Sequence, residues 1–332
     1  MSLMLLVGCS SKSVSPAVSG KSQKVPHWIS QPPQQAGMTY GARVMEVYSN
    51  PADAVKRATE LGRVDLVSNL KVTVESNFSH STTETSATDK TTQVQQNVSH
   101  YVRSQIPTAE LDEVQVSETL VTDNWAYVLV ELDRQQAASR LRRNIADIDT
   151  DLAAIAQQQP QGNKLQQLQP LLPALKLFAQ REALSERLEL VSVERRGAVL
   201  SAELKALEAR IYQQIDGLVV NLEFTNAAAK QLEGSLLEAL TAQGLRIQKG
   251  QAADLTFAVS GIHTQKQQRG NDYAFIDTQV VIKDSQQRVL NAFSKQAKGV
   301  SGMGNMAQQK AIIETAELIT NELAVTLADK LR

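Results

Sequence analysis

An apolar repeat in the middle of the chain places the strongest constraint on the fold. Between Ala138 and Ile155, apolar residues recur alternately three and four positions apart. The members of this repeat are Ala138, Leu141, Ile145, Ile148, Leu152 and Ile155. Such spacing lines one side of an α-helix, as the a and d positions of a coiled coil do, whereas a strand would alternate at every second residue. The sequence therefore predicts a helix here.

The repeat resumes after the polar segment QQQPQGN, residues 157–163, which is predicted to be a turn. The residues that continue it are Leu165, Leu168, Leu172, Leu175 and Ala179, and later Leu200, Leu204, Leu207 and Ile211. Pro170 and Pro173 are expected to break or restart the helix, and a kink is expected near Gly197. Residues 134–213 are thus predicted to form a long antiparallel helical hairpin. Its seam either packs on itself or is shared with another protein or a second copy of the chain.

A proline-rich segment opens the region that precedes the hairpin, residues 25–133. Pro26, Pro32 and Pro33 favour extended backbone. Trp28 lies among these prolines and is expected to anchor the segment to the domain that follows.

A strand and then a helix are predicted next. Residues 38–49 are rich in strand-forming side chains and include Gly41 as a possible bulge. Asn50 can cap a helix, and Pro51 fits its first position. The apolar or small residues that follow at helical spacing are Val55, Ala58, Gly62, Leu66 and Leu70. This pattern predicts a helix with one buried face.

Residues 71–102 alternate only weakly, and within them residues 79–96 are dense in Ser, Thr and Gln. This dense run predicts a long polar β-hairpin or a mobile loop. Two strands joined near residues 122–124 are predicted to close the region. In the second of them, one face would consist of Trp125, Tyr127, Leu129 and Glu131, and the other of Ala126, Val128, Val130 and Leu132.

From about Asp216 onward, the signals follow the order strand, helix, three strands and helix. The first helix is expected to end at Gly244, and turns are expected at QQRGND and DSQQ, residues 267–272 and 284–287. The last helix would bury Ile312, Ala316, Ile319, Leu323, Leu327 and Leu331. This order resembles the small α/β domains of periplasmic envelope proteins, such as the Tol translocation proteins. The resemblance implies a docking module.

The only cysteine, Cys9, follows a short apolar run at residues 6–8. This stretch resembles the lipobox of bacterial lipoproteins, which implies that Cys9 is lipidated and becomes the new N-terminus. A full secretory signal would also carry a basic segment and a longer apolar core, yet the first basic residue is Lys12. We therefore expect that the natural start is trimmed or replaced. The alternative is a disordered terminus with an incidental thiol.

The residues after the cysteine bear on location and on covalent cross-links. Ser10 and Ser11 replace the aspartate that would hint at inner-membrane retention, so the resemblance points to the outer membrane. Residues 12–24, rich in Ser, Gly and Lys, are predicted to form a flexible tether. One cysteine cannot form a disulfide within the chain, and a lipidated one leaves no free thiol.

Length, composition and net charge narrow the classes of protein to which the chain can belong. A length of 332 residues favours two or three domains, and 42% apolar residues can build a sizeable core. A formal charge of −1 argues against an electrostatic nucleic-acid partner, which would need a basic face. The sequence also has no apolar run of 18 residues, so no helix is expected to span a bilayer.

Several features of the first region together resemble the LPP-twenty-like family of bacterial outer-membrane lipoproteins and their flagellum-associated relatives. The matching features are Pro26 and Trp28 with Pro32 and Pro33, the strand with Tyr40 and Gly41, the alanine-bearing helix from Ala52, and the closing strand YVLVELDR. The resemblance covers residues 25–140. It implies a domain with a helix packed on an antiparallel sheet, a place in the cell envelope and no known chemistry.

Catalytic and metal-binding patterns are weak. The four histidines, His27, His80, His100 and His263, are far apart and have no second ligand at helical or turn spacing. Residues 147–151, DIDTD, imitate a calcium loop but lack its glycine and final glutamate, so they are interpreted as a solvated helix face. Residues 299–306, GVSGMGNM, match no phosphate loop and are interpreted as a flexible connection. We therefore expect no metal, no cofactor and no enzymatic activity.

The predicted fold class is α+β, with two small α/β sandwich-type modules of antiparallel sheets joined by the helical hairpin. The predicted domains are a lipobox remnant and tether (1–24), an LPP-twenty-like domain (25–133), the hairpin (134–213) and a C-terminal docking domain (214–332).

The predicted function is that of a lipid-anchored, periplasm-facing scaffold or assembly protein of the outer membrane, with the flagellar basal body as the favoured example. The expected partners are the outer membrane, through the lipid on Cys9, and an envelope protein from the flagellar or cell-wall machinery, while a homo-oligomer stays open. A regulator of a peptidoglycan synthase and a small-ligand-binding envelope protein are the alternatives.

Overall fold

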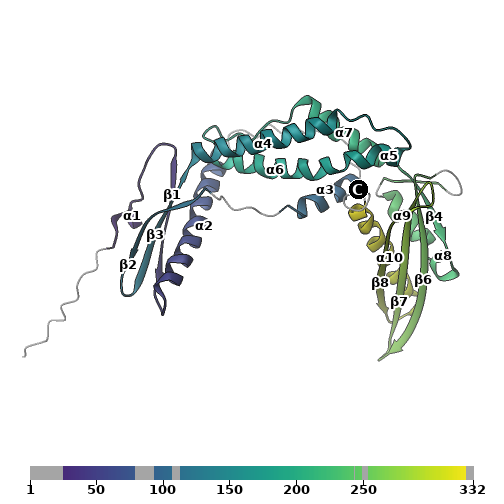
Figure 1. Cartoon of the computed structure of the whole chain (residues 1–332). Helices are drawn as coiled ribbons and strands as arrows, with labels where there is room; N and C mark the ends of the chain where they lie inside the picture. Colours follow the sequence, from purple (N-terminus) through teal and green to yellow (C-terminus); the bar gives the residue numbers. More distant parts are fainter. Residues whose placement is uncertain (1–24, 79–92, 107–112, 243, 249–252, 327–332) are drawn as a thin grey trace, which may run out of the picture. The chain divides into compact units, whose positions relative to one another are not determined.

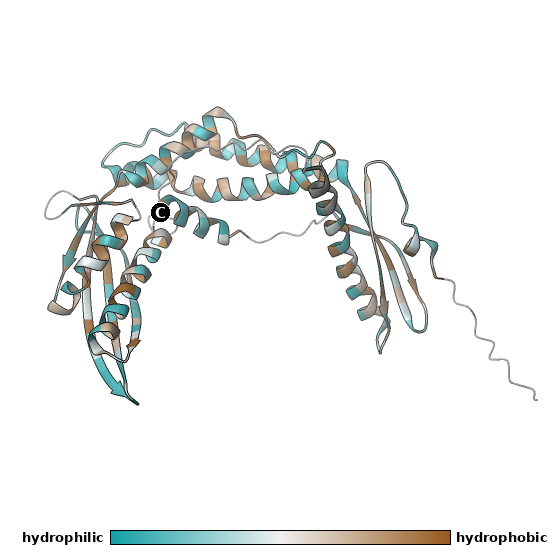
Figure 2. Cartoon of the chain, turned by 180° about the vertical axis from the view of Figure 1, so that it is seen from behind, coloured by the Kyte–Doolittle hydropathy of each residue, from teal (hydrophilic) through white to brown (hydrophobic). Residues whose placement is uncertain are grey.

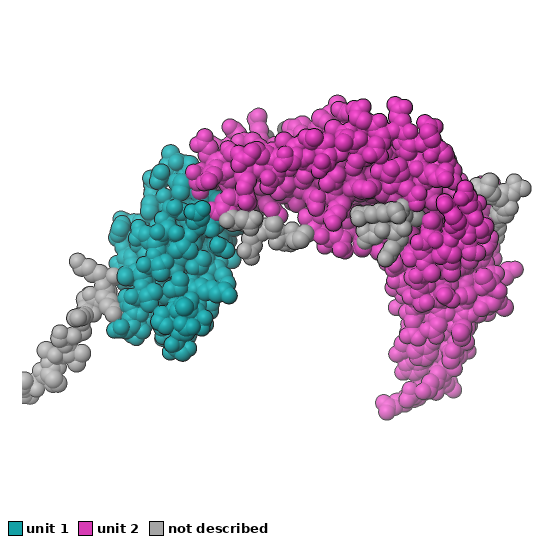
Figure 3. Space-filling model, viewed as in Figure 1, with its two compact units in different colours: residues 1–69, 114–132 teal, residues 70–113, 133–332 magenta. Residues whose placement is uncertain are grey.

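The computed structural model describes residues 25–78, 93–106, 113–242, 244–248 and 253–326 (Figure 1). Cys9, the predicted tether and His80 lie outside these residues, as do Leu327 and Leu331 of the predicted last helix. The chain divides into two compact units: unit 1 takes residues 1–69 and 114–132, and unit 2 takes residues 70–113 and 133–332 (Figure 3). Both units contain helices and a sheet, so the fold is α+β. The finer division into four predicted segments stays a prediction.

Unit 1 contains a three-stranded sheet in the order β1-β3-β2. Its strands are β1 (Met38–Glu46), β2 (Gln115–Val121) and β3 (Trp125–Asp133). The last two form an antiparallel hairpin in which Val121 pairs with Ala126, so the turn lies at residues 122–124 as predicted. The short helix α1 (His27–Ser30), which the proline pattern did not predict, precedes the sheet.

Trp28 anchors this segment to the sheet, as predicted. Its side chain is only 3% exposed and packs with Tyr127 and Leu129 on one face of β3, together with Tyr40 of β1. Alternate residues of β3 face opposite sides of the sheet, so the predicted division of this strand into two faces is confirmed.

The helix α2 (Pro51–Phe78) crosses the sheet at very short range. Its buried stripe consists of Ala54, Ala58, Gly62, Leu66 and Leu70, close to the predicted one. A Cβ atom added to Gly41 would lie 2.3 Å from the backbone oxygen of Gly62, and one added to Gly62 would touch Val130 at 3.4 Å. Gly41, which the sequence suggested as a bulge, is therefore explained by the close approach of a helix to the strand.

Of the run predicted to be a polar hairpin or loop, residues 79–96, only residues 93–96 are described, and there the prediction is wrong because they are helical. Residues 71–78 continue α2, and α3 (Gln93–Ser104) is a second helix. The buried residues of α3 are Val94, Val98 and Val102, which are four positions apart. This period is helical, but its β-branched residues and polar neighbours resemble a strand, and packing against the rest of unit 2 decides the outcome.

Unit 2 has a helical part that differs from a two-helix hairpin. Its further elements are α4 (Arg134–Ala156), α5 (Lys164–Leu168), the 3₁₀ helix η1 (Gln169–Leu171), α6 (Pro173–Val191) and α7 (Ala202–Asp216). The helices α4 and α6 pack together, and α3 and α7 add to them, so the arrangement is a bundle. Pro173 restarts the helix as predicted.

The predicted kink near Gly197 is a complete break, because residues 192–201 are not helical. This stretch lies against α6, where the backbone N–H of Ala198 donates to the Ser185 hydroxyl at 2.9 Å. A Cβ atom at Gly197 would come within 2.5 Å of the same hydroxyl. Side chains of α6 thus satisfy the backbone that has left the helix.

The C-terminal part of unit 2 is a five-stranded sheet in the order β5-β4-β6-β7-β8 with helices on it. Its elements are β4 (Val219–Phe224), α8 (Ala227–Lys230), α9 (Glu233–Ala242), β5 (Arg246–Ile247), β6 (Leu255–Gln268), β7 (Asn271–Asp284), β8 (Val289–Ser301) and α10 (Gly304–Val325). The predicted order of elements is confirmed with two differences: α8 and α9 divide the expected single helix, and the two-residue strand β5 was not predicted. The apolar cores of the sheet and of the bundle form one cluster.

This sheet is mixed, so the prediction of antiparallel sheets holds only for part of it. The pairs β6–β7 and β7–β8 are antiparallel, but β4 pairs in parallel with both β5 and β6. The connection through α8 and α9 returns the chain to the same end of the sheet, which makes parallel pairing possible.

The interpretation of residues 299–306 as a flexible connection is wrong. Gly299 belongs to β8, where a Cβ atom would lie 1.7 Å from the backbone oxygen of Ala307 and 2.7 Å from the nitrogen of Ala311. This glycine lets α10 lie directly on the strand. Only Gly302 and Met303 separate the two elements.

The helix α10 also protects the free edge of β8. The backbone N–H of Lys298 donates to the Glu314 carboxylate at 3.3 Å, and the Lys310 ammonium donates to the Val300 carbonyl at 3.2 Å. Unpaired groups at a sheet edge can pair with another chain, and charged side chains are a common way to prevent this.

Replacing both Lys310 and Glu314 by alanine is expected to expose this edge and to promote self-association. Light scattering coupled to size exclusion should show dimers or larger species that grow with concentration. The matched control replaces Gln309 and Glu317 of the same helix, whose side chains are exposed and, among the described residues, form no hydrogen bond or ion pair with β8. Equal behaviour of the two double variants would contradict the protective role.

Candidate functional site

A cavity of about 400 Å³ lies inside the helical bundle of unit 2. It is open to solvent on one side and is lined by α3, α6, α7 and the non-helical residues 192–201. Its apolar lining consists of Val102, Leu175, Phe178, Ala179, Ala198 and Leu200. The α6 residues recur at helical spacing, so one face of that helix forms a wall of the cavity.

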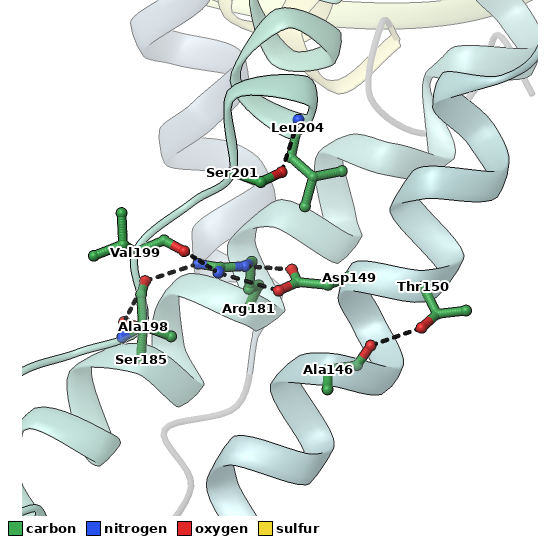
Figure 4. A network of polar contacts seen from close by, with 9 residues as sticks. All are labelled: Ala146, Asp149, Thr150, Arg181, Ser185, Ala198, Val199, Ser201 and Leu204. Atoms are coloured by element: carbon green, nitrogen blue, oxygen red, sulfur yellow. Dashed lines mark hydrogen bonds and ion pairs between the residues drawn. The ribbon is translucent and has the colours of Figure 1, made fainter.

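A buried arginine fixes the geometry of this wall (Figure 4). The Arg181 side chain is 6% exposed and binds the Asp149 carboxylate of α4 through two hydrogen bonds of 2.6 and 3.2 Å. Its remaining donors reach the carbonyls of Ala198 and Val199 at 3.2 and 3.0 Å. One guanidinium thus ties together α4, α6 and the segment at residues 192–201, which is a positioning role.

A second guanidinium lies at the mouth of the cavity. Arg103 of α3 pairs with Glu182 at 3.1 Å and with Glu186 at 2.5 Å. These side chains are about half exposed, so water weakens the pairs. The pairing nevertheless satisfies the charge of Arg103 with two carboxylates of α6.

The remaining charged side chain of the lining, Glu208 of α7, has no ion-pair partner among the described residues. Burial raises the pKa of its carboxyl group, and the negative charge of Glu182 raises it further. Burial also raises the pKa of Tyr212 to about 12, with a contribution from the charge of Glu208, while a hydrogen bond with Ser99 opposes the change. Removal from water explains both directions, because it disfavours the charged forms.

The outer face of the five-stranded sheet is a second candidate surface. Gly299 meets α10 and Gly261 meets α8 on one face, so alternate residues point to the other face. On that outer face the cross-strand neighbours Ile262, Asp277 and Gln296 are exposed.

A lysine and two aromatic rings lie together on the same face. The ammonium of Lys298 lies 5.0 Å from the ring centre of Tyr273 and 5.8 Å from that of Phe275. The tip of the β6–β7 hairpin is hydrophilic (Figure 2).

The residues singled out in the sequence do not assemble into a site. His27 and His100 are exposed, and His263 is half-buried with its Nδ1 3.1 Å from a Gln231 oxygen. Burial lowers the pKa of His263. Within the described ranges, no group of three or more His, Cys, Asp or Glu side chains could hold a metal ion.

The interpretation of residues 147–151 as a solvated helix face is confirmed only in part. They lie on α4, and Asp147 and Asp151 are exposed, but Asp149 is the partner of Arg181. Sequence reasoning missed this pair. A usable signal existed, since Arg181 continues the buried stripe of Ala174 and Phe178 on α6, and a charge on an apolar stripe needs a buried counter-charge.

No helix in the described part of the chain is long and apolar enough to cross a membrane. The chain matches no protein-family model and no curated protein.

Three solved structures illustrate the similarities that were found. The secreted protein HP1454 of Helicobacter pylori is 17% identical, with 88% of this chain and 99% of that one covered and a TM-score of 0.48. A minor lipoprotein of Acinetobacter baumannii is 18% identical over 32% of this chain and 90% of that one, with a TM-score of 0.29. The PelC dodecamer of Paraburkholderia phytofirmans is 16% identical over 30% of this chain and 85% of that one, with a TM-score of 0.25. Similarities at these levels assign neither a family nor a function, and the resemblance to the LPP-twenty-like family stays a prediction.

Proposed function

We propose that this chain is a lipid-anchored protein of a bacterial cell envelope that acts as a non-catalytic scaffold or assembly factor. The observation that carries the proposal is the lipobox-like stretch at residues 6–9, with its cysteine followed by a polar, Ser- and Lys-containing segment. A lipid on Cys9 would confine the protein to a membrane surface and raise its effective concentration near a partner there.

The residues after the cysteine support the outer membrane as the anchoring site, with the folded units in the periplasm. Ser10 and Ser11 carry this part of the proposal. The resemblance of residues 25–140 to LPP-twenty-like lipoproteins supports flagellar basal-body assembly as the favoured role. The partner would dock on the outer face of the five-stranded sheet, where exposed Ile262 lies beside polar and charged groups.

Replacing Cys9 by serine is expected to release the protein from the membrane. A serine hydroxyl cannot replace the sulfur that carries the lipid, and each buried CH₂ of that lipid contributes about 0.8 kcal/mol to membrane binding. After cell fractionation, the variant should move from the outer-membrane pellet to the soluble periplasm and should no longer incorporate labelled palmitate. Ser11→Ala serves as the control and should stay in the pellet. A Cys9→Ser protein that still sediments with outer membranes would refute lipid anchoring.

The partner can be identified with the full-length protein. Cells are cross-linked, the lipidated protein is purified, and the captured proteins are identified by mass spectrometry. Enrichment of basal-body ring proteins would support flagellar assembly. Enrichment of peptidoglycan synthases without flagellar proteins would instead favour the regulator, and Ile262→Asp should reduce either capture if the outer face is the docking surface.

A further inference from the structure

The Glu208 carboxylate lines the cavity in a place where its negative charge is disfavoured. Of the basic groups lining the cavity, Arg181 is held by Asp149 and Arg103 by Glu182 and Glu186. No ion pair among the described residues includes Glu208. Burial and a neighbouring carboxylate both disfavour its charge. A cation placed next to it would remove both penalties at once.

The remaining lining matches the other requirements of an organic cation. Phe178 and Tyr212 bring two aromatic rings to the same cavity as Glu208, and the faces of such rings attract cations. Val102, Leu175 and Leu200 supply an apolar surface. A volume of about 400 Å³ lies within the usual range for small-molecule sites.

An anion fits this cavity less well. Both guanidiniums already bind carboxylates, so an anion would have to break an ion pair, and it would approach Glu182 and Glu208. An uncharged apolar molecule would contact the apolar lining of the cavity but would leave the Glu208 carboxylate without a partner.

We propose that this cavity binds a small organic ammonium ion with an apolar or aromatic body, whose nitrogen pairs with Glu208. Glu182 adds a second carboxylate to the lining of the cavity, and the rings of Phe178 and Tyr212 hold the body of the ligand. The proposal concerns unit 2 alone and does not depend on anchoring through Cys9. A failure of membrane attachment and a failure of ligand binding are therefore separate results.

The test uses benzylammonium as the probe and benzyl alcohol and benzoate as its uncharged and anionic counterparts. Binding to the full chain is measured by calorimetry near neutral pH. Benzylammonium should bind about tenfold more tightly than benzyl alcohol, because a hydrogen bond to a charged group contributes about 1.5–3 kcal/mol. Benzoate should bind least. The Glu208→Gln variant should lose this preference for the cation.

The matched control is Glu189→Gln, which changes a carboxylate of α6 that does not line the cavity. It should bind the probe as the unaltered protein does. Glu208→Gln removes an unfavourable buried charge, so it should fold at least as stably, and its thermal midpoint verifies this. Equal affinities for benzylammonium and benzyl alcohol, stronger binding of benzoate, or full binding by Glu208→Gln would each overturn the proposal.

A pH series adds an independent measurement. The charged and titratable groups that line the cavity with Glu208 are Arg103 of α3, Arg181 and Glu182 of α6, and Tyr212 of α7. Lowering the pH protonates Glu208 before an ordinary glutamate, because its pKa is raised by burial and by Glu182. Affinity for benzylammonium should fall accordingly, and this fall should be absent from Glu208→Gln. A pH-independent affinity would contradict the pairing.

Discussion

Replacing Arg181 by methionine is expected to lower the free energy of unfolding by about 3 kcal/mol. Methionine keeps most of the volume of the side chain but cannot donate hydrogen bonds. Asp149 would lose two charge-assisted bonds, and the carbonyls of Ala198 and Val199 would lose their donors. Denaturant unfolding should show a lower midpoint with an unchanged slope.

A matched pair on the surface separates this effect from a general effect of charge. Arg142 pairs with Glu194 at 3.2 Å, and both side chains are at least half exposed. Arg142→Met should therefore cost less than about 1 kcal/mol. The combined variant Arg181→Met and Asp149→Leu should recover part of the lost stability, because the partly buried carboxylate of Asp149 is then not left unpaired. A cost for Arg181→Met no greater than that for Arg142→Met would contradict the positioning role.

Replacing Gly299 by alanine is expected to cost about 3 kcal/mol or more, through a different mechanism. The new methyl group would overlap the backbone of α10, at Ala307 and Ala311, and a helix backbone cannot rotate away as a flexible side chain can. The helix would have to move off the sheet. Thermal unfolding monitored by circular dichroism measures the loss.

Gly302→Ala provides the control for this prediction. It lies three residues further on, no atom would come within 4 Å of its new Cβ, and its φ is not positive. Its effect should stay within about 0.5 kcal/mol. If both alanine variants unfold at the same temperature, the close contact between β8 and α10 is not what requires glycine at position 299.

Local periodicity explains what the sequence predicts well. The buried stripe of α4, the hairpin that turns at residues 122–124 and the three long strands of the second sheet all follow from repeats within a few residues. Such periodic signals report only which side of a helix or strand faces the core. They do not report which other element packs against that side.

Features that depend on distant contacts were missed. The helical state of residues 93–104 rests on packing against α6, α7 and α10. The parallel pairing of β4 with β6 brings together residues separated by 35 positions, and no local pattern reports it. The cavity requires three helices at once, and only the placement of Arg181 on an apolar stripe offered a signal for its surroundings.

The protection of β8 by α10 also has a consequence during biosynthesis. A ribosome releases β6, β7 and β8 before the helix that covers their edge, since α10 follows them in the chain. Until Lys310 and Glu314 emerge and dock, the edge at Lys298 and Val300 lacks its caps. Partly folded chains with unpaired strand edges are prone to aggregate, so the chain is exposed to that risk during this interval. Because α10 is the last element of the chain, its docking is the step that protects the edge of β8 from aggregation.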